Sequence, residues 1–268
     1  MKVAFILTMH QSKEIRPNGF YLVDRYLKSL KNSCSFDYTV FLFDNTSEDK
    51  FNLDKYSDMD IRYTYVDDQT KRGNTGPWND GTLEAFEEGY DKIFVSNDDL
   101  IFNKSINYLI INTTDDNVIY GPLCQPGGML GGSPQMSSHP IEEIIDITGK
   151  GEVGELPTEG HLLNGFLFGF TNEFFKKYKR DDGYVFNSNN EYIWNANECE
   201  FQLRLWKKGV RSRLVGASWI YHEKIRAWKY HFGQRVSQED YDNLSERKSL
   251  DYEQNWKEKM EQLPFEED

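Results

Sequence analysis

Apolar positions in the first part of the chain follow two alternating patterns. Runs that are rich in apolar, aromatic and β-branched residues, which are typical of buried strands, lie at 3–7, 37–45, 61–68 and 93–96. Between these runs apolar residues recur at helical spacing: they are Leu22, Val23, Tyr26, Leu27 and Leu30, and then Leu83, Phe86 and Tyr90. Strands that alternate with helices predict an α/β fold, built on a mostly parallel sheet that is flanked by helices.

The second half of the chain is less regular. An apolar strand at 118–123 leads into a Gly-, Pro- and Ser-rich stretch that reaches to about residue 160. A loop of that length inside a compact domain is usually functional or disordered. The pattern then predicts a strand at 162–171, a helix at 198–209 that Gly209 ends, and a last strand at 212–223.

The composition is that of one globular domain with a tail. The 268 residues are 38% hydrophobic, which is enough to bury one sizeable core. We expect a domain over 1–235, with a nucleotide-sugar-binding half at 1–122 and an acceptor half at 123–235, and an acidic helical tail over 236–268. No stretch approaches the roughly 20 apolar residues that a membrane helix needs, and the three cysteines are scattered. These features predict a cytoplasmic protein without a transmembrane segment.

Charge is unevenly distributed along the chain. The net charge is −13, which argues against general binding of nucleic acid, yet residues 204–235 contain nine Lys or Arg and one acid, Glu223. These basic side chains either pair with the acidic tail or attract an anionic ligand.

Several carboxylates fall at the carboxyl ends of predicted strands. They are Asp44, Asp67, Asp68, Asp98 and Asp99. A buried, unpaired carboxylate costs several kcal/mol, so the pair Asp98-Asp99 is expected at an open strand end that faces water, a cation or a ligand. Ligands of open α/β sheets bind beyond the carboxyl ends of the strands. The pair is thus either a structural turn or a site for Mg²⁺ or Mn²⁺, which favour carboxylate oxygens.

The order of short motifs resembles the GT-A fold glycosyltransferases, particularly the large inverting family 2. The likeness runs over about residues 3–224. It rests on "LTMH" after the first strand, "LKSL" in the first helix, "FDNTSED", "GNTGPWNDG", the Asp-x-Asp-like "VSNDDL", "NGFLFGFTNEFF", "NECEFQLRLWKKG" and "WIYHE". The resemblance implies transfer of a sugar, with inversion at the anomeric carbon, from a nucleotide diphosphate donor (a UDP-sugar is favoured) to an acceptor hydroxyl.

Matching these motifs residue by residue implies roles for individual side chains. Asp99 and His222 would ligate Mn²⁺ or Mg²⁺, and Glu198 would be the general base that takes a proton from the acceptor hydroxyl. The positions that match nucleotide-sugar contacts are Thr8, His10, Asp44, Asn79 and Asp98. Several of these residues have plain structural alternatives: His222 as an ordinary strand-end histidine, Glu198 as a first-turn glutamate, and Asp44 as a cap on the turn that follows it.

The chain departs from the family pattern at two positions. Asn97 stands at the first position of Asp-x-Asp, and Asn197-Glu198 replaces the usual Glu-Asp pair. A metal-ligating carboxylate and a candidate base remain in each case. Glu200 is a competing base, but two residues on from Glu198 it would point elsewhere on a helix.

The basic stretch extends the hypothesis to the donor and the acceptor. Because Arg226 and Lys229 closely follow His222, they are expected to hold the donor diphosphate. The remaining basic residues would then attract an anionic acceptor, such as an acidic polysaccharide, a phospholipid-linked glycan or a hydroxylated nucleic-acid base. Two other functions stay open: a non-catalytic nucleotide-sugar-binding module on the same fold, and a sugar-phosphate nucleotidyltransferase, although the amino terminus lacks the Gly-rich basic loop that the latter needs.

Overall fold

The structure is a computed structural model, and it describes residues 1–11, 20–45, 47–66, 73–125, 153–155, 163–188 and 197–222. In chain order its elements are β1 (Lys2–Met9), α1 (Tyr21–Ser33), β2 (Asp37–Asn45), the short 3₁₀ helix η1 (Leu53–Tyr56), β3 (Ile61–Val66), α3 (Thr75–Glu87), β4 (Lys92–Asn97), β5 (Leu100–Ile101), α4 (Ile106–Asn112), β6 (Val118–Gln125), β7 (Val153–Glu155), β8 (Leu167–Thr171), α6 (Asn172–Tyr178), α7 (Asn197–Lys207) and β9 (Arg211–His222).

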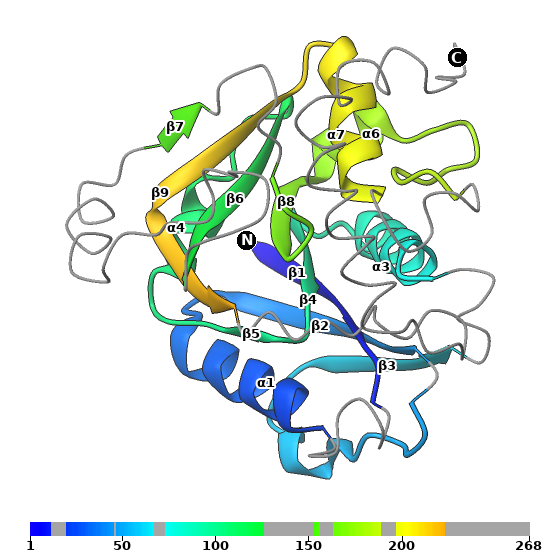
Figure 1. The fold of residues 1–268 in the computed structure, drawn as a ribbon, viewed down its shortest axis with the longest axis vertical. Coiled ribbons are helices and arrows are strands. Elements are labelled where there is room, and N and C mark those ends of the chain that lie inside the picture. The colour runs from blue at the N-terminus through cyan, green and yellow to red at the C-terminus, as the bar shows by residue number, and fades with distance from the viewer. Residues whose placement is uncertain are drawn as a thin grey trace, which may run out of the picture.

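These strands form one mixed sheet in the order β3-β2-β1-β4-β8-β6-β9-β5, with β7 paired to β9 (Figure 1). The strands β3, β2, β1 and β4 are parallel to one another. Beyond β4 the pairing changes, because β8 runs antiparallel to both β4 and β6, while β6 and β9 are parallel. The parallel arrangement that the sequence predicts is therefore found in the amino-terminal half, and the carboxyl-terminal half is mixed.

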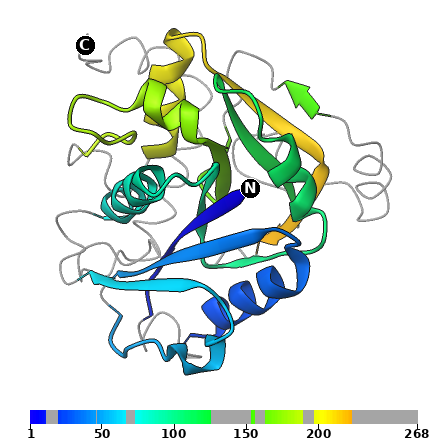
Figure 2. The same cartoon turned by 180° about the vertical axis from the view of Figure 1, so that it is seen from behind.

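Helices cover both faces of the sheet, as Figures 1 and 2 show from opposite sides. Alternate residues of β1 point to opposite faces, which is the period of a strand. Val3, Phe5 and Leu7 pack with α1 and α4 in one apolar cluster. Ala4 and Ile6 belong to a second cluster, which is formed with α3, α6 and α7. The predicted α/β fold with flanking helices is thus confirmed.

Local sequence signals explain where most elements begin and end. β2 covers the same residues, 37–45, as the apolar run. Gly89 and Gly209 follow α3 and α7 with φ of 70° and 89°, a conformation that only glycine adopts without cost. α3 begins earlier than its apolar spacing indicates, at Thr75, so most of the Gly- and Asn-rich segment is helical and buried.

Two further sequence predictions concern a membrane segment and the carboxyl-terminal tail. No helix among the described residues is long and apolar enough to cross a membrane. The predicted tail over 236–268, and the boundary at residue 235, lie outside the described residues.

Candidate active site

The carboxyl ends of the central parallel strands meet at one edge of the sheet. In the register of these strands, Thr8 of β1 is the neighbour of Asn97 of β4, and Met9 of β1 is the neighbour of Asp44 of β2. Residues that are far apart in sequence are thereby brought to the edge where ligands of open α/β sheets bind. Asp98 and Asp99 follow directly on from β4 at this edge.

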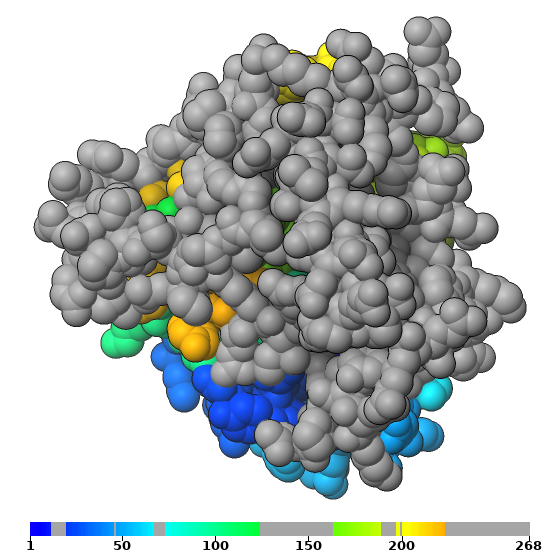
Figure 3. Space-filling model, viewed as in Figure 1, coloured from blue at the N-terminus to red at the C-terminus, as the bar shows by residue number. Residues whose placement is uncertain are grey.

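The structure brings Asp99 and His222 together, as required by the roles that the sequence assigns to them. β5 starts immediately after Asp99 and pairs antiparallel with the end of β9, so that Leu100 lies opposite His222. The Nε2 atom of His222 is 3.2 Å from Oδ2 of Asp99, and these side chains are only 11% and 5% exposed. In the space-filling view of Figure 3, atoms of β9 (orange) and α1 (blue) reach the same face of the molecule.

This pair has the donor chemistry of a divalent-metal site. Adjacent ligands in an octahedral shell of Mg²⁺ are about 3 Å apart, given metal–oxygen distances of about 2.1 Å, and the 3.2 Å between Nε2 and Oδ2 is close to that separation. Within the described residues, no group of three His, Cys, Asp or Glu side chains is placed to hold a metal. Mg²⁺ commonly takes only one or two protein ligands and completes its shell with water and phosphate oxygens. The two residues therefore fit a metal that is shared with a diphosphate.

A short segment ahead of β8 connects this pair with Glu198. The ring of Phe166 packs against the imidazole of His222, with centroids 4.9 Å apart, and the carbonyl of Phe166 accepts a hydrogen bond of 2.9 Å from the backbone N–H of Asn97. One residue earlier, Gly165 lies against the side chain of Glu198. An ideal Cβ on Gly165 would be only 3.1 Å from Glu198 Cδ. His222 and Glu198 thus contact the same short segment, Gly165 and Phe166.

Gly165 owes its identity to this close approach. Its backbone is not among the positive-φ glycines, so an alanine is acceptable to the backbone conformation. A Cβ at 3.1–3.3 Å from the Glu198 side chain would still require that side chain to move. The sequence pattern predicts a buried strand over 162–171 but does not predict the contacts of Gly165 and Phe166. A glycine among bulky apolar residues is the one sequence feature that indicates a close approach of another group.

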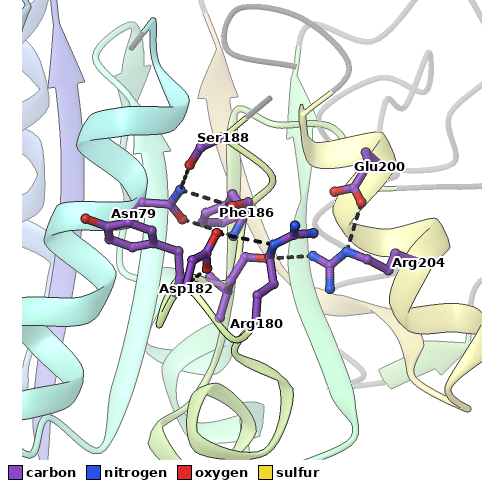
Figure 4. Close-up of polar contacts among 9 residues, drawn as sticks. Asn79, Arg180, Asp182, Phe186, Ser188, Glu200 and Arg204 are labelled. Carbon is purple, nitrogen blue, oxygen red and sulfur yellow. Dashed lines mark hydrogen bonds and ion pairs between the residues drawn. The ribbon is translucent and has the colours of Figure 1, made fainter. Parts of the chain in front are cut away.

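The competing carboxylate, Glu200, is engaged elsewhere. α7 is helical over Asn197–Lys207, as predicted, and Glu200 is buried on it. Its Oε1 accepts a hydrogen bond of 2.8 Å from Nε of Arg204, and Arg204 also donates to the carbonyl of Val185 at 2.6 Å (Figure 4). Glu198 is only partly buried and lies on the side of Gly165. Of the two carboxylates, Glu198 is thus the more exposed, and Glu200 is the one held in a buried ion pair.

Asn197, the residue that departs from the family pair, has a structural role. Its side-chain amide donates to Oγ1 of Thr75 at 3.0 Å and its Oδ1 accepts from the backbone N–H of Glu198 at 2.9 Å. The first bond joins the start of α7 to the start of α3, because Thr75 is the first residue of that helix. Asn197 thus fixes the helix turn that carries Glu198.

Two of the predicted nucleotide contacts are occupied within the protein. Asp44 is fully buried, and its carboxylate accepts hydrogen bonds from the hydroxyl of Tyr63 at 2.6 Å and from the backbone N–H of Ser47 at 3.0 Å. Burial, and then the bond to Asp44, raise the pKa of Tyr63. The bond to Ser47 is the turn cap that we considered as the alternative role of Asp44.

Asn79 is engaged in the same way. Its amide donates to the carbonyl of Phe186 and to the hydroxyl of Ser188, and its oxygen accepts from the N–H of Phe186, each at 3.0 Å (Figure 4). The side chain is fully buried on α3. These three bonds make Asn79 an anchor for the chain that follows α6, and its contact with the donor stays a prediction.

The remaining predicted nucleotide contacts lie around the end of β1. Nδ1 of His10 is 2.7 Å from the carbonyl of Asn45, and because a carbonyl only accepts, this nitrogen carries the proton. His10 and Asp98 line one recess, together with residues Met9, Gln11, Phe20, Leu22 and Val23. Thr8 is buried and directly precedes Met9, which lines this recess. Arg226 and Lys229 lie outside the described residues.

Solved structures of two glycosyltransferases, GalNAc-T7 and TarS, superimpose on this chain. GalNAc-T7 with UDP, GalNAc and Mn²⁺ superimposes with a TM-score of 0.58 at 16% identity, over 82% of this chain and 43% of the GalNAc-T7 chain. TarS 1–349 of S. aureus gives 0.57 at 14% identity, over 94% of this chain and 71% of that one. Its complex with UDP-GlcNAc gives 0.56 at 15% identity, over 95% and 67%.

At the level of sequence, no protein-family model and no curated protein matches the chain. The chain spans less than half of the length of GalNAc-T7. At identities this low the likeness concerns the fold, which is that of the GT-A-like glycosyltransferases.

Proposed function

We propose that the protein is a metal-dependent, inverting glycosyltransferase that moves a sugar from a UDP-sugar to an acceptor hydroxyl. The observation that carries this proposal is the arrangement of Asp99, His222 and Glu198 around the segment of Gly165 and Phe166. The fold supports it, since the solved structures above include one with UDP, GalNAc and Mn²⁺ and another with UDP-GlcNAc. The order of motifs resembles that of the inverting family 2, which supports transfer with inversion.

The proposed reaction needs a proton acceptor on one side of the sugar and charge neutralisation on the other. Asp99 and His222 would hold a divalent ion, which when bound offsets the charge of the leaving diphosphate. Glu198 takes the proton of the acceptor hydroxyl as the acceptor oxygen forms its bond to the anomeric carbon. The bond from that carbon to the diphosphate oxygen breaks with its electron pair, so UDP leaves and the configuration inverts.

The experiment that tests this proposal separates donor binding from transfer. A panel of UDP-, GDP- and dTDP-sugars with and without Mn²⁺ is expected to give Mn²⁺-dependent binding of UDP-sugars and release of UDP. Binding without any transfer or hydrolysis, for every donor of the panel, would instead identify a non-catalytic binding module.

The metal assignment has its own test, which does not require the sugar to be known. In calorimetry with UDP and Mn²⁺, Asp99→Ala is expected to abolish the Mn²⁺-dependent part of UDP binding. Asp58→Ala is the matched control, because Asp58 is a 58% exposed carboxylate that pairs with Lys31 away from this edge. Unchanged Mn²⁺ and UDP affinity in Asp99→Ala would refute the assignment.

We propose in addition that Arg226 and Lys229 hold the donor diphosphate and that neighbouring basic residues attract an anionic acceptor. Long-range attraction between exposed charges weakens with salt, because the Debye length falls from about 10 Å at 0.1 M to about 3 Å at 1 M. Michaelis constants for donor and acceptor are therefore expected to rise with salt. A flat dependence for the acceptor, with wild-type donor affinity in Arg226→Ala and Lys229→Ala, leaves only the structural role of these charges.

A further inference from the structure

Gln202 has an unusually complete set of hydrogen bonds for a buried side chain. It lies on α7 and is 2% exposed. Its Oε1 accepts from the backbone N–H of Leu163 and from the hydroxyl of Ser212, each at 2.8 Å. Its Nε2 donates to the carbonyls of Leu163 at 2.7 Å and of Glu198 at 3.0 Å. A primary amide has two donors and two acceptor positions, so all four are used.

Two of these bonds hold a single residue from both of its backbone polar groups. The N–H and the carbonyl of Leu163 both pair with the amide of Gln202. Leu163 lies ahead of β8, whose pairing with β4 begins at Leu167. The amide therefore does for Leu163 what a neighbouring strand does within the sheet: it fixes both the position and the orientation of the peptide groups.

The residues next to Leu163 are those that contact the candidate catalytic groups. Gly165 lies against Glu198, and Phe166 packs on His222 and bonds to Asn97. A third bond of the amide goes to the carbonyl of Glu198 itself. One side chain thus ties the helix turn that carries Glu198 to the segment that touches His222.

We propose that Gln202 is a positioning residue for the sugar transfer, which sets where the Glu198 carboxylate lies relative to Asp99 and His222. This inference rests on the proposed function. Other side chains of similar size cannot replace it: ionised Glu has no donor for the two carbonyls, and Met has neither a donor nor a strong acceptor. The small displacement that follows would lower the rate of the chemical step more than the affinity for donor, because misplacement of about 1 Å can cost about 10² in rate.

The test compares two variants, each of which removes a side-chain amide that bonds to backbone groups. The two amides lie in different parts of the protein. Gln202→Met removes the four bonds described above. Asn107→Leu is the matched control: the amide of Asn107 donates to the carbonyls of Ser33 and Lys104 and accepts from the N–H of Ser35, each at 2.8 Å. These bonds tie α4 to the end of α1, in the layer that lies on the other face of the sheet from α7.

Steady-state kinetics of UDP release, with the donor that the panel selects, is the first measurement. We expect Gln202→Met to lower kcat about 10- to 100-fold with the donor KM within about twofold of wild type. Asn107→Leu should lose thermal stability with kcat unchanged. If Gln202→Met does not fold, Gln202→Glu retains the acceptor for Leu163 and Ser212 and should show the same split between kcat and KM. A wild-type kcat in the folded variant would overturn the inference and leave the proposed function standing.

Hydrogen–deuterium exchange is the second measurement, and it does not depend on activity. In Gln202→Met the peptide that covers 163–168 should exchange at least about tenfold faster, whereas in Asn107→Leu the acceleration should fall around Ser35. If the wild-type protein transfers no sugar from any donor, the proposed function fails. Hydrogen–deuterium exchange still tests whether Gln202 holds the segment at 163–168 in place. Faster exchange at 163–168 supports it, and unchanged exchange there overturns it.

Discussion

Two glutamates on α7, Glu198 and Glu200, lie in different surroundings on opposite sides of the helix. On one side Glu200 is buried, pairs with Arg204 and, through Arg204, holds the carbonyl of Val185. On the other side Glu198 is only partly buried and lies against Gly165, while its backbone carbonyl is held by Gln202. Because consecutive residues of a helix are about 100° apart, carboxylates two positions apart must face different surroundings.

This difference separates a carboxylate that belongs to a buried ion pair from one that is partly exposed. Burial in the ion pair with Arg204 denies Glu200 the access to a substrate that proton transfer requires. The side chain of Glu198 instead lies against Gly165, and the backbone carbonyl of Glu198 is held by the amide of Gln202. Substitutions on the two sides of α7 should therefore have different effects.

The largest effect is expected for Glu198→Gln. Removal of a general base typically lowers the rate by 10² to 10⁴, or about 3–5 kcal/mol in activation free energy. Affinity for the donor should stay near that of wild type, because the base acts on the acceptor. Single-turnover kinetics, with calorimetry of donor binding, measures both quantities. If Glu200→Gln gave this loss and Glu198→Gln did not, the assignment of the two sides would be reversed.

The opposite profile is expected for Glu200→Ala. The variant leaves the guanidinium of Arg204 buried without its carboxylate, and breaking a buried pair in this way costs about 3–5 kcal/mol. Urea denaturation should therefore show a much lower free energy of unfolding, while kcat per folded molecule stays close to wild type. A stable variant with a strongly reduced kcat would contradict the structural role of Glu200.

Gly165→Ala sharpens the comparison on the side of Glu198. The added methyl would lie 3.1–3.3 Å from the Glu198 side chain and displace it. We expect kcat to fall about tenfold, which corresponds to about 1.4 kcal/mol, with little change in melting temperature because a flexible side chain can give way. Gly183→Ala, at a positive φ of 85° with open space around it, is the control that should lose stability and keep kcat.

The smallest effect is expected when both members of the ion pair are replaced. In Glu200→Leu with Arg204→Met no buried charge is left unpaired, and such replacements are often neutral or stabilising. The free energy of unfolding should return to within about 1 kcal/mol of wild type, the residual loss coming from the carbonyl of Val185. A double variant as unstable as Glu200→Ala would show that the pair itself specifies the fold.

The sequence was most informative where one local pattern decides the outcome. The apolar run at 37–45 and the helix closed by Gly209 are local patterns, and the structure confirms both elements. The proximity of Asp99 and His222 also followed from motif order, because each falls at a strand end. The antiparallel insertion of β8 depends on pairing between distant strands, and no local pattern encodes it.

Side-chain partners were the least predictable part of the candidate site. The motifs predict donor contacts at Asn79 and Asp44, and the structure adds partners within the protein, which are Phe186, Ser188, Tyr63 and Ser47. An Asn or Asp looks the same in sequence whether it meets a ligand or bonds to the protein's own backbone. The hydrogen bonds of Gln202 could not be predicted from a local pattern either, because its partner Leu163 is 39 residues away in sequence.

The pairing of β5 with β9 has a consequence for how the protein folds. Asp99 and His222 meet only when the last residues of β9 add to the sheet, although Asp99 belongs to the early strands. Contacts between residues so far apart in sequence form late, because the intervening chain must first be ordered. A partly folded molecule can therefore contain the parallel strands β1 to β4 before Asp99 and His222 meet. If these two residues hold Mn²⁺ as proposed, recovery of Mn²⁺ binding during refolding would report when β9 joins the sheet.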